Sequence, residues 1–347
     1  MLQRSFLLPF SFFLLLLAAC APPGPRTLTV MTHDSFALSE EVAVEFEQAN
    51  GIELQFLKSG DAGEALNKAI LSKGNPLADV FYGVDNTFLS RALDEGVFEP
   101  YPSPLLAGIP AEFQLDPANG ALPVDYGDVC LNYDKGWFEE RYLSPPATLA
   151  DLTLPEYNKL LVVENPATSS PGLAFLLATI AQFGPEGYLR YWQDLRANGL
   201  KVVNDWNTAY STEFSGSTGR GPRPIVVSYS SSPLFEVIFA DTPPAAAPTA
   251  AVVGPGACFR QIEFVGILRV TKNRDLAEKW VDFMLSPRFQ EDMPLQMYVF
   301  PVNPQAKLAE TFQKYLVAPQ QPASLPPAEI AAHREQWLEA WTEAVLR

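Results

Sequence analysis

The run VVSYSSSPLF, Val226 to Phe235, places one tyrosine and three serines directly after a short apolar segment. Tyr229 offers an aromatic face, and the serines that follow offer hydroxyl groups that both donate and accept hydrogen bonds. A ring among small hydroxyls suits the recognition of a small, flat, polar ligand. Pro233 suits the first turn of a helix, so the segment is predicted to run from a strand through a turn into a helix.

The sequence carries no strong catalytic motif. Its two histidines, His33 and His333, do not lie at metal-ligand spacing from each other or from a cysteine. The run STGRGP lacks the lysine of a phosphate-binding loop, and FSGSTG is not followed by the strand-to-helix turn of a serine hydrolase. The sequence therefore predicts no metal site, no cofactor and no enzyme.

One enzyme hypothesis stays open, and it depends on cysteine. Cys130 and Glu263 lie on two long β-like segments, so a thiol nucleophile and a carboxylate base could both face a cleft. The competing interpretations are a disulfide between Cys130 and Cys258 or two buried free thiols. Export to an oxidising compartment permits the disulfide, but the sequence does not decide between these two.

The start of the chain is typical of an exported lipoprotein. Arg4 precedes an apolar run, Phe6 to Ala19, that is too short to span a bilayer comfortably but suits a signal peptide. The run ends in LAAC, which resembles a lipobox. We therefore expect a signal peptide over 1–19, a lipid on Cys20 that anchors the protein to a membrane, and a tether over 20–26. The alternative is an ordinary signal peptide that leaves Cys20 as a spare thiol.

Length and charge limit the classes of partner. No later apolar run reaches the roughly 18 to 20 residues that a membrane span needs, so the mature chain is expected to be soluble, and we expect a monomer. The 347 residues suffice for one large core or for two lobes. A formal net charge of −16 argues against nucleic acid as the main partner.

Strand-like and helical segments alternate in two blocks. The first block predicts strands at TLTVMT, IELQFL and ADVFYG and helices over 40–49, 62–72 and 87–93. The second predicts strands at LLVVENP, LKVV and PIVVSY and helices over 172–183, 186–198 and near 208. Helices over 275–285, 306–315 and 327–346 follow, and DTPPAAAPTAA reads as a surface loop.

This alternation predicts an α/β fold whose mainly parallel sheets are flanked by helices. Two long β segments, ALPVDYGDVCLNYDK and CFRQIEFVGILRV, join the blocks, so the chain is expected to cross between two lobes at least twice. Ligands bind beyond the carboxyl ends of parallel strands, which are the turns that begin at His33, Gly60 and Gly83.

Segments at that predicted cleft, taken in order, resemble the thiamine-binding proteins of bacterial ABC importers, within the larger group of two-lobed periplasmic solute receptors. The resemblance covers nearly all of the mature chain. The segments that carry it are THDSFA, SGDAGEALN, ADVFYGVDN, NPATSSPGLAFLL, NDWNTAY, SYSSSP, QIEFVGILRVTKN, SPRFQEDMP, YVFPVN and PPAEIAAHREQWLEAWTEAV.

The resemblance implies a type II periplasmic-binding-protein fold with the ligand cleft between its lobes. Lobe 1 would hold 27–128 and 258–305, and lobe 2 would hold 129–257 and 306–347. It also implies thiamine or a thiamine phosphate as the ligand, the transmembrane subunits of an ABC permease as partners, and a periplasmic or cell-surface location.

The resemblance also implies a set of ligand-binding positions. Three depart from the residue usual in the family: His33 and Tyr298 replace a tyrosine and a tryptophan, and Ala62 replaces a glycine. The positions in this chain are His33, Asp61, Ala62, Ser169, Ser170, Trp206, Tyr229, Ser230, Ser231, Ser232 and Tyr298.

The chemistry of thiamine agrees with these residue types. Its thiazolium is a permanent cation, and Trp206, Tyr229 and Tyr298 can supply aromatic faces for cation–π contact. The helix start at TSSPG could attract a phosphate, although Thr168 or Ser169 could equally serve as a helix cap.

Two other solutes remain alternatives, as does a thiamine-degrading enzyme of the same fold that uses Cys130. Iron-binding relatives usually present two adjacent tyrosines where this chain has SYSS, and a polyamine site would want more carboxylates beside the aromatics. Asp34 and Asp85 could neutralise a cation or cap a turn. Four tryptophans at helical spacing are expected in the core: Trp192, Trp280, Trp337 and Trp341.

Overall fold

The structure is a computed structural model that describes residues 25–216, 220–238, 240, 244–319 and 321–347. The predicted signal peptide over 1–19 and the predicted lipid site at Cys20 lie outside the described residues. Of the predicted tether, Pro25 and Arg26 are described, and Arg26 already opens the first strand. None of the described helices has the length and apolar character to cross a membrane.

Within the described residues, eleven strands form one sheet, whose main path runs β2-β1-β3-β10-β5-β8-β6-β7. Three short strands lie off this path: β4 pairs with β10, and β9 and β11 pair with β5. The strands are β1 (Arg26–Thr32), β2 (Ile52–Lys58), β3 (Val80–Asp85), β4 (Phe98–Glu99), β5 (Leu122–Asp134), β6 (Leu161–Glu164), β7 (Lys201–Val203), β8 (Ile225–Tyr229), β9 (Thr249–Val252), β10 (Phe259–Leu268) and β11 (Phe300–Pro301).

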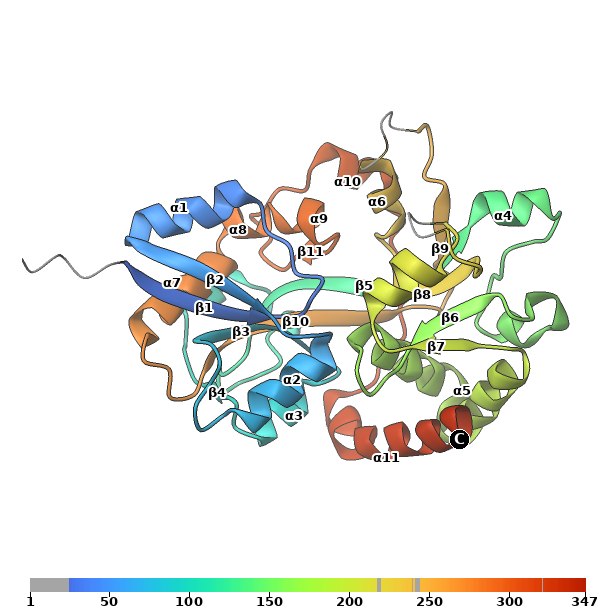
Figure 1. The fold of residues 1–347 in the computed structure, drawn as a ribbon, viewed down its shortest axis with the longest axis horizontal. Helices are drawn as coiled ribbons and strands as arrows, with labels where there is room; N and C mark the ends of the chain where they lie inside the picture. The colour runs from blue at the N-terminus through green and yellow to red at the C-terminus, as the bar shows by residue number, and fades with distance from the viewer. Residues whose placement is uncertain (1–24, 217–219, 239, 241–243, 320) are drawn as a thin grey trace, which may run out of the picture.

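Helices cover both faces of this sheet, as the alternating pattern predicts (Figure 1). The α-helices are α1 (Glu40–Asn50), α2 (Ala62–Leu71), α3 (Leu89–Asp94), α4 (Lys135–Glu140), α5 (Ser170–Ala197), α6 (Pro233–Ile238), α7 (Arg274–Leu285), α8 (Pro287–Gln290), α9 (Met293–Gln296), α10 (Glu310–Tyr315) and α11 (Pro327–Leu346). A π-helical turn covers Thr208–Glu213.

The two long β segments form β5 and β10, which lie side by side and antiparallel at the centre of the sheet (Figure 1). β10 also pairs with β3, and β5 with β8, so they join a parallel group at each end of the sheet. The sequence predicted a separate sheet for each lobe. The structure has one continuous sheet because the crossing strands pair with each other and with both groups.

An apolar layer lies beneath the whole sheet. α2, α3, α5 and α11 cover this face, and their buried side chains form one cluster that runs from Met31 to Val345. α1, α7, α8 and α9 bury a second cluster against the other face of the β2-β1-β3 half. The four tryptophans expected in the core are buried, which confirms that prediction.

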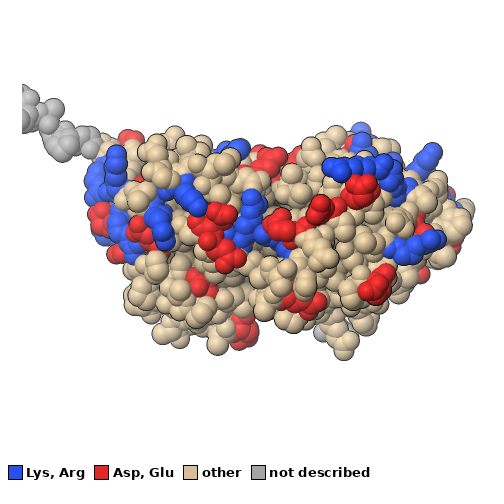
Figure 2. All heavy atoms as spheres, turned by 90° about the horizontal axis from the view of Figure 1, so that it is seen from below, with Lys and Arg blue, Asp and Glu red and all other residues tan. Residues whose placement is uncertain are grey.

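On the molecular face that Figure 2 shows, acidic and basic side chains are mixed with one another.

The break predicted between the helices over 172–183 and 186–198 is confirmed, because non-helical backbone at Gly184 (φ 72°), just before Pro185, divides α5. Other predicted elements differ from the observed ones. The helix predicted over 306–315 begins only at Glu310. The loop prediction for DTPPAAAPTAA is wrong at its end, because Thr249 to Ala251 belong to β9 and pair with β5.

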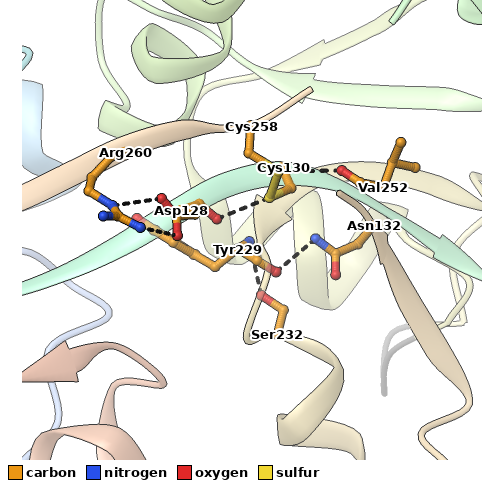
Figure 3. Close-up of a disulfide and its surroundings, with 8 residues drawn as sticks. All are labelled: Asp128, Cys130, Asn132, Tyr229, Ser232, Val252, Cys258 and Arg260. Atoms are coloured by element: carbon orange, nitrogen blue, oxygen red, sulfur yellow. Dashed lines mark hydrogen bonds and ion pairs between the residues drawn. A yellow bond between two sulfur atoms is a disulfide. The ribbon is translucent and has the colours of Figure 1, made fainter. Parts of the chain in front are cut away.

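A disulfide between Cys130 and Cys258 links β5 to the residue that precedes β10 (Figure 3). The two Cα atoms lie 4.3 Å apart, and both cysteines are fully buried. Nearby, the Arg260 guanidinium holds the Asp128 carboxylate through two hydrogen bonds of 3.0 Å. The bond decides between the two interpretations that the sequence left open. It also removes the free Cys130 thiol that the enzyme hypothesis required.

Removing this disulfide should destabilise the fold. The bond joins residues separated by 128 positions, so its loss frees a long loop in the unfolded chain. We expect the double substitution Cys130→Ala and Cys258→Ala to lower the free energy of unfolding by about 2–5 kcal/mol, measured by urea unfolding. Reduced wild-type protein is the matched control and should unfold with the variant. Equal midpoints for oxidised wild type and variant would contradict the expectation.

Candidate functional site

A cavity of about 380 Å³ lies where strand ends and helix starts from both halves of the sheet converge. This volume falls within the range of small-molecule sites. Its walls include the turn after β1, the end of β2, the start of α2, the start of α5, the end of β8 and the segment after α9. The cavity therefore lies at the carboxyl ends of parallel strands, where the sequence predicted the ligand cleft.

Seven of the eleven predicted site residues line this cavity: His33, Asp61, Ser170, Trp206, Tyr229, Ser232 and Tyr298. The other four are buried and do not line it: Ala62, Ser169, Ser230 and Ser231. The reason is local geometry. The turn after β8 directs Tyr229 and Ser232 to the cavity, whereas the Ser231 hydroxyl donates to the Tyr298 carbonyl. Ala62 and Ser169 lie at helix starts, where their neighbours Asp61 and Ser170 face the cavity.

The Trp206 indole is fixed by stacking and by a chain of hydrogen bonds. Its ring lies parallel to Tyr210, with centroids 5.0 Å apart and 12° between planes. Its Nε1 donates to Ser228 Oγ at 2.9 Å, and Ser228 Oγ lies 2.7 Å from Ser232 Oγ. Ser232 Oγ also accepts from the Tyr229 backbone N–H at 3.1 Å. If Ser228 donates its proton to Ser232, the Ser232 hydroxyl can donate into the cavity.

Tyr229 is held at both ends. Its hydroxyl donates to Gln261 Oε1 at 2.9 Å, and its carbonyl accepts from Asn132 Nδ2 at 3.0 Å (Figure 3). Its ring lies against Gly127, where an added Cβ would be 2.9 Å from Tyr229 Cδ1. The absence of a side chain at Gly127 on β5 therefore leaves room for the Tyr229 ring.

Tyr298 adds a third aromatic wall and has an unusual backbone. Its φ is 58°, in the left-handed region that bulky residues rarely adopt. The Ser231 hydroxyl holds its carbonyl, and its ring meets Phe235 edge-on with centroids 5.3 Å apart. Such strained positions cluster at ligand sites, where the surrounding contacts maintain them.

The starts of α2 and α5 meet across the cavity. Asp61 caps α2, and its Oδ2 accepts from the Trp206 backbone N–H at 3.3 Å. Ser170 Oγ, at the start of α5, accepts from Gln261 Nε2 at 2.6 Å. The Gly63 backbone N–H donates to the Thr168 carbonyl at 3.1 Å, so segments from the two halves are in direct contact.

Three carboxyl groups occupy directly opposed positions on neighbouring strands. Glu263 on β10 pairs with Asp85 on β3 and with Asp125 on β5. The β10 register shifts just after Glu263 relative to β5 and just after Phe264 relative to β3, and such bulges re-aim side chains. Of these three carboxyl groups, that of Glu263 lines the cavity.

The pKa values of these three carboxyl groups are shifted in different directions. Burial raises the pKa of Asp85 to about 6, against hydrogen bonds from Thr87 that lower it. Burial and the Glu263 charge raise the pKa of Asp125 well above its ordinary value. Burial alone would raise the pKa of Glu263 too, but contact with His33 lowers it. Of the three, Glu263 is therefore the carboxyl whose ionisation the folded chain favours.

Other residues that line the cavity lie outside the predicted set. The sequence analysis considered Glu263 only as a catalytic base. The β-bulge that follows it in β10 could not be predicted from the alternation of apolar and polar residues. Asp34, left open between ligand contact and capping, lines the cavity and also accepts from the Gly60 N–H at 2.8 Å. Lys58 is the last residue of β2, and the strand-end argument could have found it. Further lining residues are Phe36, Phe235, Gln296 and Met297.

Comparison with known proteins places this chain among solute-binding proteins. A family model described as bacterial extracellular solute-binding protein matches residues 75–320. A thiamine-binding periplasmic protein of Brucella suis biovar 1 (strain 1330) is 30% identical over 352 residues, which cover 98% of each chain. The protein of the same name from Escherichia coli (strain K12) is 30% identical over 96% of this chain and 98% of its own.

A solved structure titled periplasmic thiamin binding protein superposes with a TM-score of 0.79 at 28% identity, over 93% of this chain and 97% of its own. This likeness confirms the fold class that the sequence predicted.

One buried carboxyl lies near the cavity without lining it. Glu164 ends β6 and has no exposed surface, and neither carboxyl oxygen accepts a hydrogen bond from another described residue. Burial, together with the nearby charges of Asp61 and Asp205, raises the pKa of Glu164 well above its ordinary value of 4.5. The folded chain therefore favours the neutral acid.

Replacing Glu164 with glutamine should raise the free energy of unfolding by an amount that grows with pH. When folding raises the pKa of a carboxyl, the free energy of unfolding is unaffected at pH values below the unfolded-state pKa. Above that pKa it falls by about 1.4 kcal/mol per pH unit until the pH reaches the folded-state pKa. Glutamine removes that cost, so urea unfolding should show a larger gain at about pH 8 than at about pH 5. Glu53→Gln, at an exposed position, is the matched control. A gain that is the same at both pH values would contradict the expectation.

Proposed function

Because the chain belongs to the family of bacterial extracellular solute-binding proteins, we propose that it captures thiamine in the cavity and delivers it to the permease of an ABC importer. The observation that carries the proposal is the cavity wall itself. Three aromatic rings, Trp206, Tyr229 and Tyr298, line the same space as the carboxyl groups of Asp34, Asp61 and Glu263. Thiamine is a flat aminopyrimidine joined to a cationic thiazolium, and both features match this wall.

The binding energy requires the cavity to enclose its ligand. Each cation–π or stacking contact contributes roughly 0.5–2 kcal/mol, whereas nanomolar affinity requires about 12 kcal/mol. We propose that the rest comes from closure of the two predicted lobes, 27–128 with 258–305 and 129–257 with 306–347. The hydrogen bonds from Trp206 to Asp61 and from Gly63 to Thr168 support this, since each would join one lobe to the other.

Phosphorylated thiamine is a further proposed ligand. α5 begins at Ser170 with Pro171 in its first turn, and both residues line the cavity. The free backbone N–H groups and the dipole of a helix start attract anions. Lys58 lines the same cavity and adds a positive charge. These features support a phosphate site beside the cation site.

We further propose an exported, periplasmic or cell-surface monomer anchored by a lipid on Cys20. The LAAC run and the periplasmic relatives support this location. The formal net charge of −16 and the interspersed charges in Figure 2 support a partner other than nucleic acid.

A polyamine is the second candidate ligand, because Glu263 brings the carboxyl groups that line the cavity to three. Ferric iron is a weaker candidate. Ser230 stands where iron receptors usually have a second tyrosine, and among the described residues no three His, Cys, Asp or Glu are grouped to hold a metal.

Calorimetry with the purified protein tests the proposal. We expect tight binding of thiamine and its phosphates, and none of spermidine or ferric citrate. Trp206→Ala or Tyr229→Ala should weaken thiamine binding at least about tenfold, because each removes an aromatic face. Trp337→Phe, buried beneath the sheet, is the control and should keep the affinity. Absence of thiamine binding would refute the function, and full affinity in both site variants would refute the placement of the ligand.

A second expectation concerns closure. An added Cβ at Gly63 would lie 2.8 Å from the Thr168 carbonyl oxygen, so Gly63→Ala should oppose the contact between α2 and the 167–168 segment. We expect at least about a tenfold loss of thiamine affinity without a fall in the urea midpoint, because alanine favours a helix more than glycine does. Gly74→Ala, which meets no atom within 4 Å, is the matched control. Unchanged affinity in Gly63→Ala would count against closure at this contact.

A further inference from the structure

His33 and Glu263 face the cavity as a pair. His33 Nε2 lies 3.4 Å from Glu263 Oε1, and the two residues are 6% and 7% exposed. Resting on the proposed function, we propose that this pair makes ligand capture proton-linked. In the empty cavity the His33 imidazolium neutralises Glu263. Bound thiamine brings a fixed cation to the same carboxylate, and His33 then releases its proton to solvent.

The position of the imidazole is built into the fold. Gly83, on β3, has φ 105°, and an added Cβ there would lie 2.4 Å from His33 Cδ2. Only a residue without a side chain leaves room for the ring at this place. The bulge on β10 turns the Glu263 carboxyl toward the same space.

The groups that face His33 come from several elements. Glu263 on β10 and Asp61 at the start of α2 favour the imidazolium, and Lys58 on β2 opposes it. The Tyr82 ring on β3 lies 5.9 Å away, and its hydroxyl donates to Asp125 on β5 at 2.6 Å. Asp34, the next residue, also lines the cavity.

The balance of these groups favours a charged histidine in the empty protein. Burial acts to lower the pKa of His33, but the Glu263 carboxylate 3.4 Å from Nε2, with the charge of Asp61, raises it above 6.5. A second cation placed against Glu263 reverses that balance, because it repels the imidazolium and occupies its counter-charge. The pKa of His33 therefore falls on binding.

The exchange of one proton for one ligand sets the pH dependence. Between the His33 pKa of the complex and that of the empty protein, each thiamine bound displaces one proton, so the dissociation constant rises about tenfold per pH unit as pH falls. Above that pKa the affinity is independent of pH. Histidine is the side chain suited to this range.

Calorimetry of the full protein with thiamine tests the proposal between about pH 6 and about pH 8.5, in buffers of different ionisation enthalpy. We expect release of up to one proton per ligand at the acid end and none at the alkaline end. NMR of the two imidazoles should show the His33 pKa falling when thiamine is added. His333, exposed on α11, is the internal reference.

Variants separate this proposal from the proposed function. Above about pH 7, where Asp85 with its pKa of about 6 is already ionised, His33→Gln should bind thiamine, at whatever strength, with no pH dependence and no proton release, whereas His333→Gln should keep the wild-type slope. Thiamine binding with a flat pH profile in the wild type would overturn the proton link and leave the function standing. A slope that persists in His33→Gln would also overturn it. Absence of thiamine binding at every pH would overturn both.

Discussion

The mutual repulsion of three opposed carboxyl groups is the constraint on which the cavity depends. Asp85, Glu263 and Asp125 occupy one row across three strands, where like charges in direct opposition destabilise a sheet. Burial adds to the cost of ionising each of them. Hydrogen bonds donated to Asp85, a raised pKa at Asp125 and the His33 imidazole beside Glu263 offset this repulsion.

Side chains around the row stabilise its carboxyl groups. Tyr82 donates to Asp125, and Gln261 and Thr87 donate to Asp85, so the outer carboxyls have partners. The bulge after Glu263 leaves the central carboxyl facing the open space instead of the sheet interior. The cavity thereby places the Glu263 carboxyl among aromatic rings.

Much of this architecture could be predicted from the sequence, because it depends on periodicity and on strand ends. The alternation of strands and helices predicted the fold class, and the resemblance predicted seven residues that do line the cavity. Ser230 and Ser231 do not line the cavity, because a motif names the residues of a turn without saying which side chains point outward. Glu263 was missed as a wall residue because a register shift is a property of strand pairing, which one strand's sequence does not contain. Its partner strands lie more than a hundred positions away.

The disulfide between Cys130 and Cys258 has a consequence for the covalent integrity of the molecule. It joins the chain where one half of the sheet gives way to the other, so the segment between the two cysteines is a closed ring attached to the rest through the two crossing strands. A protease that cuts once anywhere within that ring opens it without separating any fragment. The row of carboxyls, only five positions along β5 from Cys130, keeps both of its crossing strands tied together. A nick in this segment, which supplies Trp206 and Tyr229 to the cavity, therefore leaves it covalently joined to the strand that carries Glu263.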